Sequence, residues 1–315
     1  MQHFLRYEDT PNPQKLLELA RSLRENPLAF QEYGRGKTLC LLFFNPSLRT
    51  RLSTQKAAYN LGMNVMVMNV GQESWQLELE DGTTMDGSTQ EHIREAAAVV
   101  SQYADVIGLR TFAELHDRQR DYAEPVLSKF VAYAQVPVFS LESATRHPLQ
   151  GLADWLTIAT HTPKPRPKVV LSWTPHPKPL PQAVANSFVS WLKNTEVELV
   201  VTQPEGFALA PEITEGVPVL YDQMAAFEQA DFIYAKSWAS YQNYGQHDSQ
   251  RTDWCIGTEQ MARTNAAHFM HCLPVRRNVV VRDAVLDAPQ SLVLEQAKNR
   301  IFSAQAVLLR LLGYP

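Results

Sequence analysis

The residues best suited to chemistry form one short run, Ser47-Leu48-Arg49-Thr50-Arg51, directly after an apolar segment. Its two hydroxyl groups donate hydrogen bonds, and a guanidinium group forms a planar fork that matches the oxygens of a phosphate. The run lies where a predicted strand turns into a predicted helix, and the N–H groups at a helix N-terminus attract anions. We interpret it as a phosphate site. The alternative is that Ser47 caps the helix and the two arginines face solvent.

The sequence does not support the common motifs that bind nucleotides, dinucleotides or metals. Gly36-Lys37-Thr38 resembles the end of a P-loop, but Gln31 stands where its first glycine is required, and the segment continues into a strand. No G-x-G-x-x-G follows a predicted strand, so a dinucleotide is not expected. The three cysteines, Cys40, Cys255 and Cys272, are far apart and form no C-x-x-C pair, which argues against a zinc site and a disulfide framework. We therefore expect no cofactor and no metal.

The composition is that of a globular protein, with 45% hydrophobic and 20% charged residues in a chain of 315. The net charge of −4 provides no basic field for nucleic acid. No segment approaches the roughly 20 apolar residues that cross a bilayer, so no membrane partner is expected. Residues 1–9 do not resemble a signal peptide, and with the scattered cysteines this favours the cytoplasm.

Alternating strands and helices must position the phosphate run. The segment 38–44 is a continuous apolar run of strand length, typical of a strand buried on both faces. Further strands are predicted at 64–70, 105–109, 136–140, 168–173, 197–202, 231–235 and 268–271. Helices are predicted between them near 13–26, 49–61, 90–104, 122–133, 148–160, 181–193, 222–229 and 295–312. A proline-dense segment at 163–167 is the best linker. The pattern predicts an α/β fold, with two doubly wound parallel-sheet domains, a cleft between them and a C-terminal helix returning to the first.

Four further segments accompany the phosphate run in a fixed order. They are Leu109-Arg110-Thr111-Phe112, Arg146-His147-Pro148-Leu149-Gln150, His271-Cys272-Leu273-Pro274 and Asn299-Arg300. Together the five segments resemble the transcarbamylase family, which includes the aspartate and ornithine carbamoyltransferases, over essentially the whole chain. The resemblance implies that residues 1–145 with the helix at 295–315 bind carbamoyl phosphate, and that 146–294 bind the amine acceptor.

The reaction needs anion donors at the phosphate leaving group and at the carbonyl oxygen, which becomes an oxyanion when the amine attacks. The resemblance implies that Arg110, His147 and Thr50 polarise this oxygen. Gln150 and the main chain at 272–273 hold the carbamoyl amide, while the Cys272 side chain could be structural. The full set implied to bind carbamoyl phosphate is Ser47, Leu48 (through its backbone), Arg49, Thr50, Trp75, Arg110, His147, Gln150, Cys272, Leu273 and Arg300.

The acceptor is indicated by Ala235-Lys236-Ser237-Trp238-Ala239-Ser240. Ornithine carbamoyltransferases have an aspartate, a tryptophan and S-M-G at this position. The aspartate carboxylate pairs with the α-ammonium group of ornithine. Lys236 would repel that ammonium by ~1 kcal/mol or more, so we expect an acylated α-amine. The sequence is similar to the N-acylornithine branch, which shares the proline-rich run 173–180. Trp75 resembles a tryptophan that this branch inserts into a neighbouring subunit's site, implying a homotrimer; alternatively, Trp75 is an ordinary half-buried aromatic residue.

The acyl group is expected to be succinyl, with acetyl as the alternative. A succinyl carboxylate needs cations or donors, which His176, Lys236 and Arg276 could supply. Gln90 occupies a position that resembles proline in the succinyl branch and glutamate in the acetyl branch; it is neutral and permits succinate. The residues implied to bind the acylornithine are Glu142, His176, Lys236, Leu273, Arg276 and Gln90.

The sequence at Leu48, 145–149 and 275–277 is more similar to the succinyl members than to the acetyl members. Gln305 stands where acetyl enzymes tend to carry lysine. We therefore predict carbamoyl transfer from carbamoyl phosphate to the δ-amine of N-succinyl-L-ornithine, giving N-succinyl-L-citrulline and phosphate, in arginine biosynthesis. A non-catalytic binding or regulatory family member is less favoured, because Arg49, Arg110 and His147 are all present.

Overall fold

A computed structural model describes residues 1–162 and 164–315. Pro163, the first residue of the predicted linker, lies outside the described residues. The chain divides into two compact units: unit 1 comprises Met1–Glu114, Gln119–Leu149 and Arg300–Pro315, and unit 2 comprises Leu115–Arg118 and Gln150–Asn299. Within the described part of the chain, no helix is long and apolar enough to span a membrane.

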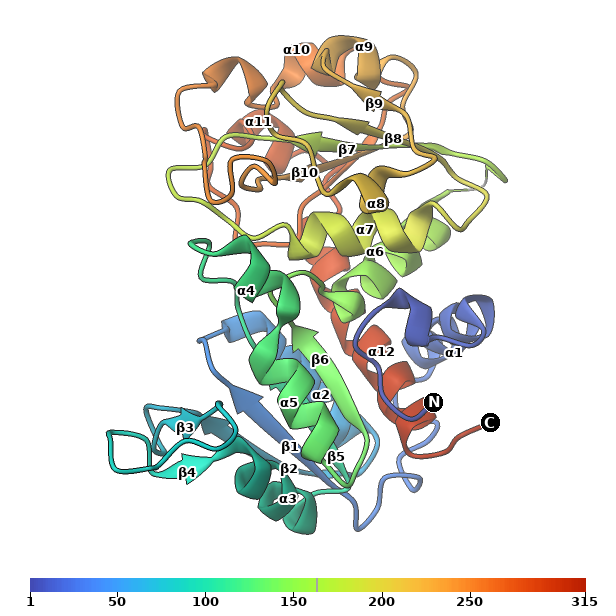
Figure 1. The fold of residues 1–315 in the computed structure, drawn as a ribbon. Helices are drawn as coiled ribbons and strands as arrows, with labels where there is room; N and C mark the ends of the chain where they lie inside the picture. Colours follow the sequence, from blue (N-terminus) through green and yellow to red (C-terminus); the bar gives the residue numbers. More distant parts are fainter. Residues whose placement is uncertain (163) are drawn as a thin grey trace. The chain divides into compact units, whose positions relative to one another are not determined.

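Unit 1 is built on a four-stranded sheet in the order β2-β1-β5-β6, with every neighbouring pair parallel (Figure 1). The strands are β1 (Thr38–Phe43), β2 (Asn64–Asn69), β5 (Val106–Arg110) and β6 (Val138–Glu142). The apolar runs of β5 and β6 form strands with both faces covered, and all five residues of each are buried. The edge strand β2 has no buried residue. Gly108 allows close packing, because a Cβ there would lie 2.8 Å from the Phe139 ring.

The helices of unit 1 follow the predicted periodicity. They are α1 (Pro13–Glu25), α2 (Leu48–Asn60), α3 (Ile93–Tyr103), α5 (Pro125–Tyr133) and part of α12 (Val293–Leu311), which continues from unit 2. The buried side chains of α3 and α5 pack with those of β1 and β5 in one hydrophobic cluster. This core holds the carboxyl ends of the strands in fixed positions.

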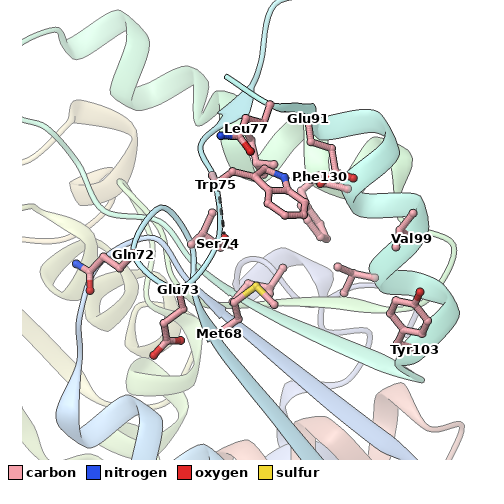
Figure 2. A pocket seen from close by; sticks show the side chains of 15 residues that line it. Met68, Gln72, Glu73, Ser74, Trp75, Leu77, Glu91, Val99, Tyr103 and Phe130 are labelled. Carbon is pink, nitrogen blue, oxygen red and sulfur yellow. Dashed lines mark hydrogen bonds between the residues drawn. The ribbon is translucent and has the colours of Figure 1, made fainter. Parts of the chain in front are cut away.

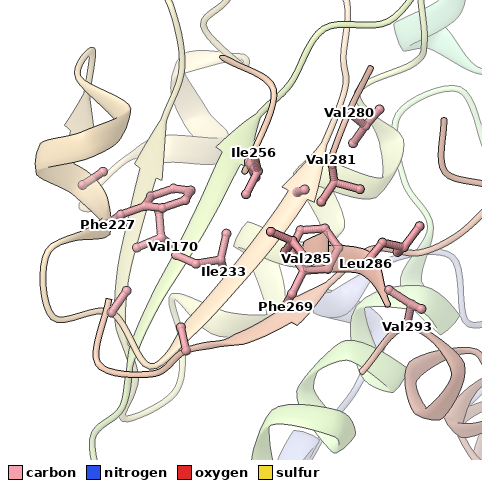
Figure 3. Packing of buried hydrophobic residues seen from close by; sticks show 14 of the residues in the cluster. Val170, Phe227, Ile233, Ile256, Phe269, Val280, Val281, Val285, Leu286 and Val293 are labelled. Atoms are coloured by element: carbon pink, nitrogen blue, oxygen red, sulfur yellow. The ribbon is translucent and has the colours of Figure 1, made fainter. Parts of the chain in front are cut away.

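Unit 2 contains a five-stranded parallel sheet in the order β11-β10-β7-β8-β9. Its strands are β7 (Lys168–Trp173), β8 (Glu198–Thr202), β9 (Val219–Leu220), β10 (Phe232–Lys236) and β11 (His268–Met270). Phe227, Ile233 and Phe269 belong to the hydrophobic cluster on this sheet (Figure 3). The order changes direction between β7 and β10, and ligands of open α/β sheets bind at such a switch point.

The helices of unit 2 are of very different lengths. The longer ones are α6 (Pro148–His161) and α7 (Ala183–Leu192), and the short ones are α8 (Pro211–Thr214), α9 (Gln223–Phe227), α10 (Thr258–Met261) and α11 (Asp283–Leu286). Glycine at position 151 permits the close approach of α6 to α7, because a Cβ there would lie 2.2 Å from Cδ1 of Trp191.

Two predicted helices differ from the structure. The helix expected at 122–133 is interrupted: α4 (Arg118–Ala123) ends, Glu124 adopts a φ of 46°, and α5 begins with Pro125. The residue before a proline is disfavoured in the helical conformation, which explains the break. The helix expected from residue 90 begins only at Ile93, because His92 caps it and pairs as part of β4 (Glu91–His92) with β3 (Leu77–Glu78).

Candidate functional site

In unit 1 the carboxyl ends of three strands bring site residues together. Arg110 is the last residue of β5, where it pairs in register with Phe43 of β1 and Glu142 of β6. The sheet order changes direction between β1 and β5, so this edge is the switch point of unit 1. The chain leaves β1 here and enters α2 at Leu48. The phosphate run therefore begins at the edge where parallel sheets bind ligands.

The first turn of α2 does not support the capping alternative. Ser47 occupies the N-cap position, but its side chain makes no capping hydrogen bond. Arg51 lies over the Phe43 ring, with its guanidinium carbon 5.9 Å from the ring centroid, so it is not simply a solvent-facing charge. The Leu48 side chain is exposed, consistent with a contribution from its backbone alone. The hydroxyl of Ser47 and the N-terminus of α2 are thus placed to receive an anion.

Thr50, His147 and Arg300 form a buried polar cluster, with 2%, 3% and 6% of their surfaces exposed. One Arg300 nitrogen, Nη2, donates to Thr50 Oγ1 at 3.0 Å, and Nη1 lies 3.3 Å from His147 Nε2. Because arginine only donates, His147 Nε2 is the acceptor in this contact. The guanidinium group of α12 thereby connects the start of α2 to the start of α6.

Arg110, Glu142 and His147 extend this cluster. Arg110 and Glu142 form a buried ion pair, and Glu142 Oε2 lies 3.7 Å from His147 Nε2. The Arg110 guanidinium also stacks over Phe112, 5.1 Å from its ring centroid. Its Nε is buried without a hydrogen-bond partner among the described residues. With Arg300, the cluster has two guanidinium groups and one carboxylate, so it carries an excess of positive charge that suits an anion.

Trp75 and Gln90 lie elsewhere in unit 1. Both line a pocket of about 710 Å³, together with Met68, Tyr103 and Phe130 (Figure 2). Trp75 is 49% exposed, and its Nε1 donates to Glu91 Oε2 at 2.7 Å. The described residues that line this pocket include none of those in the buried cluster. The structure thus brings Trp75 and Gln90 together, but not with Thr50 or Arg110 in the same pocket.

In unit 2, Lys236 ends β10 at the switch point of the sheet and is only 9% exposed. It pairs in register with Trp173, the last residue of β7. Thr174 N donates to the Lys236 carbonyl at 3.2 Å, and the hydroxyls of Thr174 and Ser237 lie 3.2 Å apart. These bonds fix the start of the proline-rich loop 173–180 beside Lys236. Lys236 is therefore placed at the carboxyl edge of this sheet, where open α/β sheets bind ligands.

His176 lies in this loop, and its environment is positively charged. Arg276 Nε donates to His176 Nε2 at 3.1 Å, and His176 Nδ1 lies 2.8 Å from the Lys178 carbonyl oxygen and 3.1 Å from Lys178 N. Burial lowers the pKa of His176, and the neighbouring charges of Lys236, Arg276 and His247 lower it further. His176 and the two cations beside it, Lys236 and Arg276, are hereafter called the cationic cluster. His247 was not singled out in the sequence, where an isolated histidine in a polar loop gives no signal.

Arg277, the next residue, has a different environment. Its two terminal nitrogens pair with both carboxylate oxygens of Asp287 at 2.7 and 2.8 Å, and Nη1 also pairs with Asp283 at 2.8 Å. Two carboxylates thus neutralise the charge of Arg277. For this reason Arg276, and not Arg277, is assigned to the cationic cluster. In the described chain, no group of three or more His, Cys, Asp or Glu residues is placed to hold a metal ion.

The predicted amide-binding residues are held by a buried network in unit 2. Gln150 Nε2 donates to Asp154 Oδ1 at 2.7 Å, and Gln296 Nε2 donates to the same oxygen at 2.6 Å. Gln296 Oε1 accepts the His271 N–H at 3.0 Å, and His271 Nδ1 accepts the Leu273 N–H at 3.0 Å. Sequence reasoning missed Asp154 and Gln296. The sequence did contain a signal for Asp154, because it lies four residues after Gln150 on a predicted helix, where the two side chains are neighbours.

Comparison with known proteins decides the family. Residues 2–160 match the carbamoyl-P binding domain of aspartate/ornithine carbamoyltransferase, and residues 181–311 match its Asp/Orn binding domain. The chain belongs to the aspartate/ornithine carbamoyltransferase family. The predicted family is confirmed, as is the predicted architecture of two α/β domains with parallel sheets.

Three individual members of the family are informative. The chain is 52% identical over 314 residues to N-succinylornithine carbamoyltransferase of Bacteroides thetaiotaomicron, covering 99% of each chain. It is 36% identical over 336 residues to N-acetylornithine carbamoyltransferase of Xanthomonas campestris pv. campestris, covering 99% of this chain and 98% of that protein. A crystal structure of an N-acetyl-L-ornithine transcarbamylase mutant, complexed with carbamyl phosphate and N-succinyl-L-norvaline, is 36% identical, covers 99% of this chain and 100% of that one, and has a TM-score of 0.92.

Proposed function

We propose that the chain transfers the carbamoyl group of carbamoyl phosphate to the δ-amine of N-succinyl-L-ornithine, a step in arginine biosynthesis. The observation that carries this proposal is the cationic cluster of unit 2, in which a buried lysine ends the inner strand β10. The 52% identity to an N-succinylornithine carbamoyltransferase supports it independently, and exceeds the 36% identity to an N-acetylornithine enzyme.

The buried cluster of unit 1 has the donors that carbamoyl phosphate requires. Ser47, the backbone at Leu48, Arg49 and Thr50 bind the phosphate in this proposal, and Arg300 assists. As the δ-amine attacks, a C–N bond forms, the C–O bond to phosphate breaks, and phosphate leaves with the electron pair and takes up the proton that the amine loses. Arg110, His147 and Thr50 stabilise the negative charge that develops on the carbonyl oxygen.

The cationic cluster discriminates between acceptors. An acylated ornithine has lost its α-ammonium charge and keeps its α-carboxylate, so Lys236 attracts the carboxylate without the repulsion that the α-ammonium group of free ornithine would add. A succinyl group adds a second carboxylate, for which Arg276 and His176 provide donors. Glu142 and Leu273 complete the proposed contacts to the ornithine moiety. N-Acetylornithine, which lacks the second carboxylate, gains less from this cluster.

A panel of acceptors tests the proposal. Purified protein is supplied with carbamoyl phosphate and, in turn, N-succinyl-L-ornithine, N-acetyl-L-ornithine and L-ornithine, and the citrulline product is measured. We expect the highest kcat/KM with the succinyl substrate and the lowest with free ornithine. A preference for the acetyl substrate would move the function to the alternative acceptor. Binding of carbamoyl phosphate without any transfer would indicate a non-catalytic family member.

We further propose that three copies of the chain assemble, and that Trp75 and Gln90 of one copy complete a neighbouring copy's site. In support, β2 is an edge strand of the unit 1 sheet, and its Met66 and Met68 side chains are exposed. Such an unprotected apolar edge is typical of a surface that another chain covers. Trp75 is likewise exposed and lines the same pocket as Met68.

Subunit mixing tests this assembly sharply. Trp75→Ala and Arg110→Ala variants should each lose most activity as pure oligomers. If Trp75 acts in the neighbouring site, a mixed oligomer contains some sites with an intact Arg110 from one copy and an intact Trp75 from the other. Activity should therefore reappear after the two variants are unfolded and refolded together. Sedimentation at the mass of a monomer, or no recovery in a mixed trimer, would contradict the proposal.

A further inference from the structure

Asp154 is a carboxylate on α6 with no exposed surface. Burying an isolated charge is costly, so a buried carboxylate is expected to bind strong donors. Two carboxamide groups donate hydrogen bonds to Asp154 Oδ1: Nε2 of Gln150 at 2.7 Å and Nε2 of Gln296 at 2.6 Å. The Tyr234 side chain is also close: burial raises its pKa well above the usual value, and the charge of Asp154 raises it further. The proposed reaction mechanism assigns no role to Asp154.

The carboxylate dictates which end of Gln150 faces it. A carboxamide has one end that only donates hydrogen bonds and one that only accepts them, whereas an ionised carboxylate only accepts. The NH₂ end of Gln150 must therefore face Asp154, which directs Oε1 to the opposite side. The NH₂ group of carbamoyl phosphate is a hydrogen-bond donor, and it requires an acceptor such as Oε1.

The second contact orients Gln296 by the same rule. With its NH₂ end on Asp154, Gln296 presents Oε1 to the His271 N–H, which it accepts at 3.0 Å. His271 in turn accepts the Leu273 N–H through Nδ1. The main chain at 272–273, also assigned to the carbamoyl amide, is thus connected to Asp154 through Gln296 and His271.

We propose that Asp154 is a positioning residue that makes the site selective for the NH₂ group of carbamoyl phosphate, by fixing the acceptor orientation of Gln150 and the 271–273 main chain. This inference rests on the proposed use of carbamoyl phosphate. Acetyl phosphate isolates the recognition of the NH₂ group, because it has a methyl group in its place. A fixed acceptor should favour carbamoyl phosphate over acetyl phosphate, because the methyl group leaves that acceptor without a hydrogen bond.

The test is calorimetric measurement of Kd for carbamoyl phosphate, acetyl phosphate and inorganic phosphate, without an acceptor present. The decisive variant is Asp154→Asn, which keeps the shape but offers a neutral amide that can donate as well as accept. We expect the preference for carbamoyl phosphate over acetyl phosphate to fall about tenfold, as when a charge-assisted hydrogen bond is replaced by a neutral one. The Kd of inorganic phosphate should change by less than about twofold, because phosphate lacks the amide. Asp154→Leu should lose at least as much preference.

A neighbouring contact provides the matched control. Asn299 Nδ2 donates to Thr157 Oγ1 at 2.9 Å, joining α12 to α6 one turn from Asp154 without involving Gln150. Thr157→Val should lower the melting temperature but leave the preference between the two ligands unchanged.

An unchanged preference in folded Asp154→Asn, or an equal loss in Thr157→Val, would overturn the inference. So would a wild-type protein that binds the two ligands equally. Failure of the proposed function is a separate result: the wild-type protein would then prefer carbamoyl phosphate but transfer it to no acylornithine.

Discussion

Replacing Lys236 by methionine should weaken the discrimination against free ornithine. Methionine keeps the unbranched apolar stem that the buried lysine packs into its surroundings, but it removes the charge. Free ornithine carries an α-ammonium group, and acylornithine does not. The substitution therefore removes a repulsion of the α-ammonium group of free ornithine and an attraction to the succinyl carboxylate of the acylated substrate. Both changes move the ratio of their kcat/KM values in the same direction.

The magnitude follows from the burial of Lys236, which is 9% exposed and therefore little screened by solvent. At an effective dielectric constant of about 20, two unit charges about 6 Å apart interact by about 3 kcal/mol. At 1.36 kcal/mol per factor of ten, this is roughly a hundredfold in kcat/KM. Longer charge separations reduce the value, so we expect a change of about 30- to 100-fold.

The assay compares kcat/KM for N-succinyl-L-ornithine and L-ornithine in the wild-type protein and Lys236→Met. Arg277→Met is the matched control, because it removes a cation that Asp283 and Asp287 already neutralise. The control should leave the ratio of the two values unchanged. An unchanged ratio in Lys236→Met, or an equal change in Arg277→Met, would refute the assignment of Lys236 to the acceptor.

Three further predictions concern other parts of the proposed site. Arg300→Lys cannot bond Thr50 and His147 with one planar group, so the KM for carbamoyl phosphate should rise about tenfold or more in initial-rate assays. Gln90→Glu adds a negative charge and should shift the ratio of kcat/KM from the succinyl towards the acetyl substrate; a constant ratio would remove Gln90 from the acyl site. The pKa of folded His176 is below the ordinary 6.5, so the unfolded state binds more protons, and stability should fall as the pH drops below 6.5 towards the folded pKa. In chemical denaturation, His176→Gln should show less of this loss.

The strands were predictable because parallel sheets are covered on both faces. The apolar run at 38–44 became β1 (Thr38–Phe43), and the run at 168–173 became β7 (Lys168–Trp173). Their ends could also be placed, since polar residues such as Arg110 and Lys236 follow buried runs. The break at Glu124 was readable from Pro125, whereas the start of α3 was not, because it depends on the pairing of two-residue strands.

The candidate site was predictable where it depends on local sequence, and not where it depends on packing. Arg300 was found from its motif, but its simultaneous contact with Thr50 and His147 requires the tertiary fold. Asp154 and Gln296 are 142 positions apart, and no periodicity relates them. Hydrogen bonds of this kind are determined by how α6 and α12 pack.

Competition between acceptors tests the central claim most directly. The purified protein receives carbamoyl phosphate with equal concentrations of N-succinyl-L-ornithine and N-acetyl-L-ornithine, and both citrulline products are quantified by mass spectrometry at low conversion. The product ratio equals the ratio of the two kcat/KM values. We predict that N-succinyl-L-citrulline predominates and that phosphate is released in equal amount to the total product. Predominance of N-acetyl-L-citrulline would contradict the assignment of the cationic cluster to a succinyl carboxylate.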